Sequence, residues 1–196
     1  MAWSKNGTTT LSSAGDDIDI TSLTASDFNV FLHHQIKTGN CQGNWTFNNN
    51  SNSVYANRWS ANGGTDGTAT SATYFDTNKG ISNFADILGV MYLCSISGEE
   101  KLAIYPMCWG GLAGAGNAPE RIEFVMKFVP SPDADITRVD INNNQTGSFD
   151  TGSNLTALNG DETETVTLQD GTIFEESDTN KAYIWNASTK TWTQLQ

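Results

Sequence analysis

Residues 121–128 alternate between an apolar set and a mainly charged set, which is the clearest structural pattern in the chain. A period of two over eight residues is typical of a β-strand with one buried face. Val125 stands in the charged set, so we expect a central sandwich strand with apolar groups on both faces. The buried face is predicted to consist of Ile122, Phe124, Met126 and Phe128.

Residues 28–36 and 101–109 alternate as well. In the first segment both faces carry apolar groups, which predicts a strand inside a two-sheet sandwich or at an oligomer interface. In the second, Pro106 lacks a backbone N–H and predicts an edge strand or a bulge. Shared faces are expected for Phe28, Val30, Leu32, His34 and Ile36, for Asn29, Phe31, His33 and Gln35, and for Leu102, Ile104, Pro106 and Cys108.

Three other segments have weaker patterns. Residues 41–55 read as a hairpin whose turn is rich in Asn, a residue that tolerates left-handed backbone angles. The apolar positions of residues 81–93 fit a helix about as well as a strand, and the β-branched and aromatic residues that follow favour a strand over 89–96. The glycines of residues 110–116 do not form a phosphate-binding motif, so we expect a loop that joins two strands.

About eight to ten short strands with turn signals between them predict an all-β fold, an antiparallel β-sandwich of jelly-roll type. We expect an N-terminal arm over residues 1–15, the sandwich over 16–160, and a small C-terminal three-stranded β-meander over 161–196. A sheet as small as this meander is marginal alone, so we expect it to lean on another surface. Its aromatic residues are Phe174, Tyr183, Trp185 and Trp192.

The net charge of −12 excludes nucleic acid and anionic membranes as main partners, because both would repel the chain. No apolar run approaches the length of a membrane span, and no apolar segment of a secretory signal follows Met1. The three cysteines have neither a paired spacing nor a metal-ligand spacing, so we expect buried thiols.

No catalytic, cofactor or metal residues are predicted. His33 and His34 are adjacent and would face opposite sides of a strand, which does not build a shared metal site. Asp16, Asp17 and Asp19 lack an EF-hand frame, and we interpret them as solvated turn carboxylates, with a structural Ca²⁺ ion as the alternative. We therefore do not expect an enzyme.

Four aromatic residues beside Asn- and Asp-rich loops could be contact or ligand residues. Stacking on sugars is one hypothesis, and a place in the core or at a subunit contact is the favoured one. These residues are Trp45, Tyr55, Trp59 and Trp109.

Two parts of the sequence resemble virion structural proteins of marine tailed phages. The ending GTIFEESDTNKAYIWNASTKTWTQL (171–195) is similar to a short module of tail fibres and head-associated proteins, from which it departs at Ala187, where glycine is usual. Residues 8–23, 46–68, 114–129 and 136–161 resemble a β-sandwich of such proteins. The resemblance carries no catalytic residues.

The resemblance implies a virion protein assembled in the host cytoplasm. We expect a capsid decoration or cement protein that acts through contacts with other virion proteins, either major capsid or fibre and tail proteins. A symmetric homo-oligomer, a trimer, is expected. The alternative is a short tail-fibre or head-fibre adhesin that binds host surface glycans.

Overall fold

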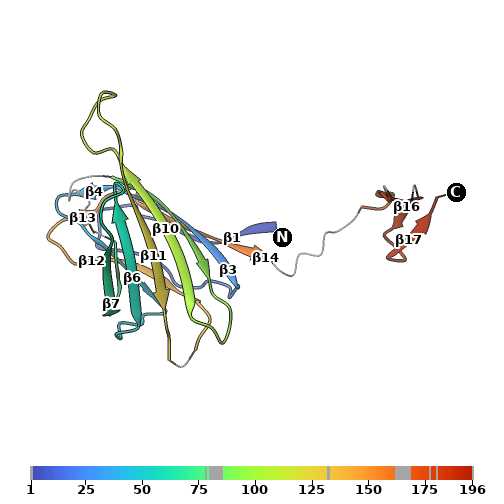
Figure 1. The fold of residues 1–196 in the computed structure, drawn as a ribbon, viewed down its shortest axis with the longest axis horizontal. Coiled ribbons are helices and arrows are strands. Elements are labelled where there is room, and N and C mark those ends of the chain that lie inside the picture. The colour runs from blue at the N-terminus through green and yellow to red at the C-terminus, as the bar shows by residue number, and fades with distance from the viewer. Residues whose placement is uncertain are drawn as a thin grey trace. The chain divides into compact units, whose positions relative to one another are not determined.

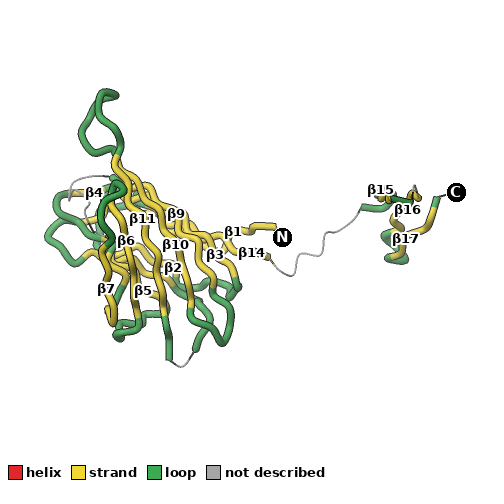
Figure 2. Tube along the Cα trace, viewed as in Figure 1, coloured by secondary structure: helices red, strands yellow, loops and turns green. Residues whose placement is uncertain are grey.

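The computed structural model describes residues 2–77, 79, 86–131, 133–161, 169–176, 178–179 and 181–195. Every regular element in this part of the chain is a β-strand (Figures 1 and 2). The chain divides into two compact units, Met1–Asp161 and Glu162–Gln196. No helix in the described ranges is long and apolar enough to cross a membrane.

The first unit is built on an antiparallel sheet of eight strands (Figure 1). Each strand pairs through the sheet with the next in spatial order. That order is β1 (Ala2–Thr10), β14 (Asn154–Asp161), β3 (Phe28–Gln35), β9 (Ile87–Cys94), β10 (Lys101–Trp109), β11 (Glu120–Phe128), β6 (Tyr55–Ala61) and β7 (Gly67–Ala72).

A smaller sheet of four antiparallel strands completes the sandwich. Its inward residues, which include Ile18, Trp45, Phe47 and Val139, are fully buried. The spatial order is β2 (Asp17–Ile20), β12 (Val139–Asn143), β5 (Gly43–Phe47) and β8 (Phe75–Asp76), and a separate two-stranded pair is formed by β4 (Lys37–Thr38) and β13 (Ser148–Phe149).

Aromatic rings fill the space between the two sheets. The Trp45 ring of the smaller sheet lies 5.2 Å from the Tyr105 ring and 6.2 Å from the Phe31 ring of the large sheet. Phe47 makes a similar contact, with its ring centroid 5.6 Å from that of Phe128. These edge-on and tilted arrangements are the ones aromatic pairs prefer, so the core is both apolar and geometrically specific.

The predicted all-β sandwich with a small separate meander is confirmed. The strand predicted from residue 121 is β11, and it lies between β10 and β6. Its four predicted core residues, Ile122, Phe124, Met126 and Phe128, expose no more than 1% of their surface. The strand predicted over residues 89–96 is β9, and residues 81–85, the start of the segment that also fitted a helix, lie outside the described residues.

Three local predictions are wrong. The expected N-terminal arm is largely strand β1, whose ladder with β14 runs from Ala2 to Thr10. The expected hairpin over residues 41–55 is a connection between the sheets, because β5 pairs with β12 and β8 while β6 pairs with β11 and β7. Pro106 lies in a central strand, where the pairing with β9 stops after Ile104 and resumes at Met107 in the same register.

The C-terminal unit is an antiparallel meander of three strands, as predicted (Figure 2). Phe174 pairs with Tyr183 across the first two strands, and Trp185 pairs with Trp192 across the second and third. The strands are β15 (Ile173–Glu176), β16 (Lys181–Asn186) and β17 (Thr191–Gln194).

A buried polar contact is embedded in the aromatic core. His33 Nδ1 lies 2.7 Å from the Tyr105 hydroxyl, and the His33 ring also stands edge-on to Trp45. Burial lowers the pKa of His33 to about 3, with smaller contributions from the nearby positive charges of His34 and Lys37. Burial likewise raises the pKa of Tyr105. His33 is therefore neutral in the folded protein across the ordinary pH range.

We expect Gly89→Ala to destabilise the sandwich by about 1–3 kcal/mol, the usual effect of overpacking a core. A Cβ at Gly89 would lie 2.5 Å from Cε2 and 2.6 Å from the hydroxyl oxygen of Tyr105. The Tyr105 ring cannot move aside easily, because it is buried and bonded to His33. Urea unfolding measures the change. Gly116→Ala is the control, since its Cβ would meet nothing within 4 Å, and equal stability of the two variants would contradict the prediction.

We expect acid to destabilise the protein through His33. In the unfolded chain His33 has its ordinary pKa of 6.5, whereas the folded value is about 3. Between these values the unfolded state binds a proton that the folded state does not, so this contribution to the free energy of unfolding falls as pH falls from 6.5 toward 3. The slope is at most about 1.4 kcal/mol per pH unit.

Urea unfolding of wild type and His33→Gln between pH 7 and pH 4 isolates this term, because glutamine can still bond Tyr105 but does not titrate. The pH dependence should be shallower in His33→Gln. The exposed neighbour gives the matched control, and His34→Gln should keep most of the wild-type slope. Identical slopes for wild type and His33→Gln would show that His33 is not the titrating group.

Candidate functional site

The outer face of the large sheet, defined as the side turned away from the smaller sheet, is more apolar than its inner face on two strands. On β10 the inward set includes Lys101 and Tyr105, while Leu102 and Ile104 point outward and are about half exposed. Strand β3 likewise turns polar residues inward and apolar residues outward. Its inward residues are Asn29, Phe31, His33 and Gln35, and its outward residues are Phe28, Val30, Leu32 and His34.

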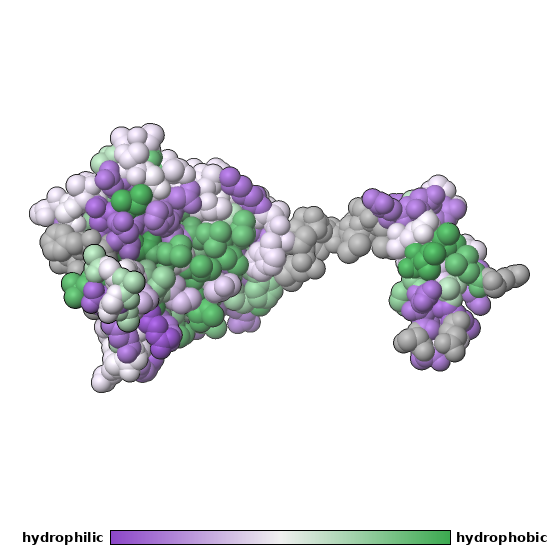
Figure 3. All heavy atoms as spheres, turned by 90° about the horizontal axis from the view of Figure 1, so that it is seen from above, coloured by the Kyte–Doolittle hydropathy of each residue, from purple (hydrophilic) through white to green (hydrophobic). Residues whose placement is uncertain are grey.

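These outward side chains form one apolar band across the sheet. The band crosses six neighbouring strands, from β1 to β11, which at roughly 4.8 Å per strand is a width of roughly 24 Å. Figure 3 shows hydrophobic residues gathered over a broad area of the sandwich surface. The large side chains of the apolar band each expose between 39 and 58% of their surface. They are Trp3, Phe28, Leu32, Leu88, Tyr92, Leu102, Ile104 and Val125.

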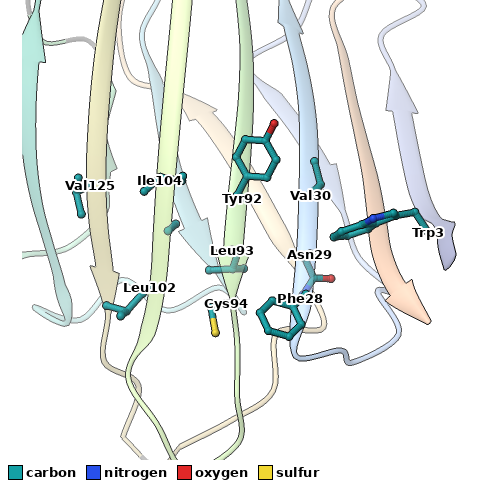
Figure 4. A pocket seen from close by; sticks show the side chains of 11 residues that line it. Trp3, Phe28, Asn29, Val30, Tyr92, Leu93, Cys94, Leu102, Ile104 and Val125 are labelled. Carbon is teal, nitrogen blue, oxygen red and sulfur yellow. The ribbon is translucent and has the colours of Figure 1, made fainter. Parts of the chain in front are cut away.

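A shallow hollow of about 600 Å³ lies within this band. In Figure 4, Trp3 and Phe28 stand on one side, Tyr92 occupies the middle, and Ile104 and Val125 stand on the other side. Three of the strands, β9, β10 and β11, follow one another along the chain, whereas β1 and β3 come from the N-terminal part and reach the hollow through the sheet order. The hollow offers almost no polar partner, so it suits an apolar occupant.

Charge is confined to the border of the band. The outward residues of β3, β9 and β10 include no Asp, Glu, Lys or Arg. On β11 and β6 the outward basic residues are each paired with a carboxylate of the same chain. The pairs are Arg58 with Asp66 at 3.1 Å, Arg121 with Glu123 at 2.9 Å, and Lys127 with Glu100 at 3.0 Å.

Two of the three cysteines also lie on this face. Cys94 lines the hollow and is half-buried, and Cys108 is exposed on β10. The third, Cys41, is buried in the core, and burial raises the pKa of its thiol to about 11. All three are free thiols. The expectation of buried thiols is therefore correct only for Cys41.

Three of the four aromatic residues singled out as contact or ligand candidates are core residues. Trp45, Tyr55 and Trp109 expose at most 3% of their surface, so none of them can stack on a sugar in this fold. Trp59 is partly buried against the core, and the Lys79 ammonium lies 5.4 Å from its ring centroid. Of the two hypotheses for these aromatic residues, the structure therefore agrees with a place in the core for Trp45, Tyr55 and Trp109.

The meander keeps its aromatic residues on one face. Phe174 and Trp192 are exposed, and Tyr183 and Trp185 are half-buried beside them. The rings contact one another, with centroids 6.1 Å apart for Phe174 and Trp192 and 5.3 Å apart for Trp185 and Trp192. A hollow of about 430 Å³ is lined by Phe174, Tyr183 and Trp192 together with Glu176.

The predicted polar candidates are engaged in contacts within the chain. Asp16 and Asp17 accept hydrogen bonds from Asn143 and Asn142, and Asp19 lies 3.1 Å from Arg138. Within the described ranges, no group of three or more His, Cys, Asp or Glu side chains is placed to hold a metal ion. His33 and His34 face opposite sides of β3, as predicted.

The apolar band was not predicted as a site. Its sequence signal was present, because residues 28–36 showed apolar groups on both faces and residues 101–109 put Leu102, Ile104 and Pro106 together. The missing information was which face meets the smaller sheet. An alternating pattern fixes which residues share a face but not which face is buried when both can be.

Comparison of the chain with family models, with curated proteins and with solved structures returns no match at any of these three levels.

Proposed function

We propose that this protein is a structural component of a tailed-phage virion, a capsid decoration or cement protein that acts through protein–protein contacts. The observation that carries the proposal is the uncovered apolar band on the large sheet. Monomeric proteins seldom expose apolar patches above a few hundred Å², and larger ones mark interaction surfaces. The sequence resemblance to marine phage virion proteins supplies the biological setting.

The size of the band is sufficient for a stable contact. Its eight large side chains together expose on the order of 800 Å², which is about what each partner contributes to a typical stable interface. Association also costs translational freedom, side-chain ordering and desolvation, so this area shows that the band is large enough for an interface and does not set an affinity.

The rest of the surface suits a particle coat. The chain has 22 acidic and 10 basic residues, and the band itself contains no carboxylate on β3, β9 or β10. The acidic excess therefore lies elsewhere, where it would keep assembled particles apart in solution. The partners in this proposal are other virion proteins, the major capsid protein first among them, with assembly in the host cytoplasm.

Phage particles that lack this protein should lose infectivity faster than wild-type particles when heated or osmotically shocked, and should adsorb to host cells at the normal rate. The physical reason is that a cement protein adds buried apolar area between capsid subunits. Survival after a heat step and the rate of adsorption are the two measurements. Particles of unchanged heat and osmotic resistance would contradict the cement role.

The aromatic face of the meander favours a second candidate function, an adhesin that binds host glycans. Exposed tryptophan and phenylalanine rings can stack on the apolar faces of sugars, and Glu176 beside them could accept hydrogen bonds from sugar hydroxyls.

For this second candidate, Trp192→Ala should reduce adsorption of the phage to host cells at least tenfold while leaving heat resistance unchanged. Ile173→Ala is the matched control, because Ile173 is exposed on the opposite face of the same meander. Adsorption rate and binding of the purified protein to host-surface glycans are the measurements. Equal adsorption by both variants and wild type would exclude the aromatic face as a glycan site.

A further inference from the structure

We propose that the apolar band of the large sheet is the surface on which a second copy of this chain packs, so that the protein is a homo-oligomer in solution before it meets a capsid. The proposal rests on the proposed function and names the partner of the band itself: a second copy covers the band, and the oligomer then meets other virion proteins through its remaining surface. It rests on the size, charge and shape of the band.

Charge favours a second copy over a partner of opposite charge. The chain carries a net charge of −12, so two copies repel each other over most of their surfaces. The band differs, because β3, β9 and β10 turn no charged side chain outward, and the basic residues at its border on β6 and β11 are paired with Asp66, Glu123 and Glu100 of the same chain. At the opposite border, Lys5 on β1 faces outward and is exposed. A strongly charged partner would find no complementary charge here, whereas a second neutral face would need none.

The shape of the band suits contact with a copy of itself. It lies on regular antiparallel strands, and two such faces can stack at the roughly 10 Å spacing of packed sheets, as in the interior of a sandwich. A face with apolar side chains in its centre and a mixed-charge border is compatible with itself under rotational symmetry. Arg121 and Glu123, both exposed at the border, give each copy a donor and an acceptor.

On β3 and β10 polar residues face the core and apolar residues face outward, which also supports a second copy over the band. A strand at a sheet surface facing water normally turns its polar residues outward. Here β10 turns Leu102 and Ile104 outward while Lys101 is fully buried and bonded to the Ile96 carbonyl at 2.7 Å and to Asp133 at 2.8 Å. An outward face of this composition is typical of a strand with a second protein layer over it, and the area of the band is about what each partner buries in a standard-size stable interface.

The test uses the purified full-length chain of 196 residues and its molar mass by light scattering at tens of micromolar. Wild type should have a mass that is a multiple of the single chain, and Leu102→Glu and Ile104→Glu should each shift the mass to that of one chain. The reason is that association would bury the introduced carboxylate in an apolar contact.

The matched control is Leu112→Glu. Leu112 is 75% exposed and lies in the loop after β10, outside the band, so this variant should keep the wild-type mass. Circular dichroism and thermal melting check that each variant is folded. A monomeric wild type, or an unchanged mass for both band variants when folded, would overturn the proposal.

A second measurement needs no substitution. Cys94 lines the hollow, so its rate of maleimide labelling, followed by peptide mass spectrometry, should fall at least fivefold as the wild-type protein is concentrated across its association range. A rate that is independent of concentration while the mass rises would show that the copies meet elsewhere, and would overturn the proposal.

The self-association proposal and the decoration proposal are tested by independent experiments. Solution mass and thiol labelling involve no phage particle, so a monomeric protein would remove self-association and leave the particle experiments to decide the decoration role. An oligomer that adds nothing to particle stability would keep self-association and remove the cement role.

Discussion

The contact of Trp45 with Phe31, His33 and Tyr105 determines which side of the large sheet is buried. Trp45 comes from the smaller sheet, and its ring centroid lies 5.2 to 6.2 Å from those of the three residues on the large sheet. Once Tyr105 and His33 point inward, the period of two forces Leu102, Ile104 and the other outward residues into solvent. The core therefore accepts polar atoms, and the outer face receives the aliphatic side chains.

The burial of His33 and Tyr105 affects both the stability of the core and the composition of the outer face. The His33–Tyr105 bond at 2.7 Å satisfies two polar groups inside an aromatic layer, where an unsatisfied group would be costly. The outer face then holds an apolar band with a shallow hollow and no charged outward side chain on β3, β9 or β10, whereas the whole chain is strongly acidic. Exposed apolar surfaces of this size are typical of interaction sites, which is the basis of the proposed contacts with other proteins.

Local sequence predicted most of the strands and little of the candidate site. The strand over 121–128 was predicted with its buried face, because one set was wholly apolar and the other was mostly charged. The hairpin over 41–55 was predicted wrongly, because turn residues show that the chain changes direction and do not show whether the second strand returns to the same sheet. Three of four candidate aromatic ligands proved to be core residues, since an Asn-rich loop beside a tryptophan says nothing about burial.

The sequence by itself determined the all-β class, the two-residue period of the main strands, the boundary near residue 161 and the acidic charge. All of these are local or compositional properties. Only the tertiary structure decided the order of the eight strands, the burial of the polar-bearing faces of β3 and β10, and hence the apolar band. The physical reason is that a strand with two usable faces has no local preference between them. The choice is made by which side chains of a distant sheet fit against it.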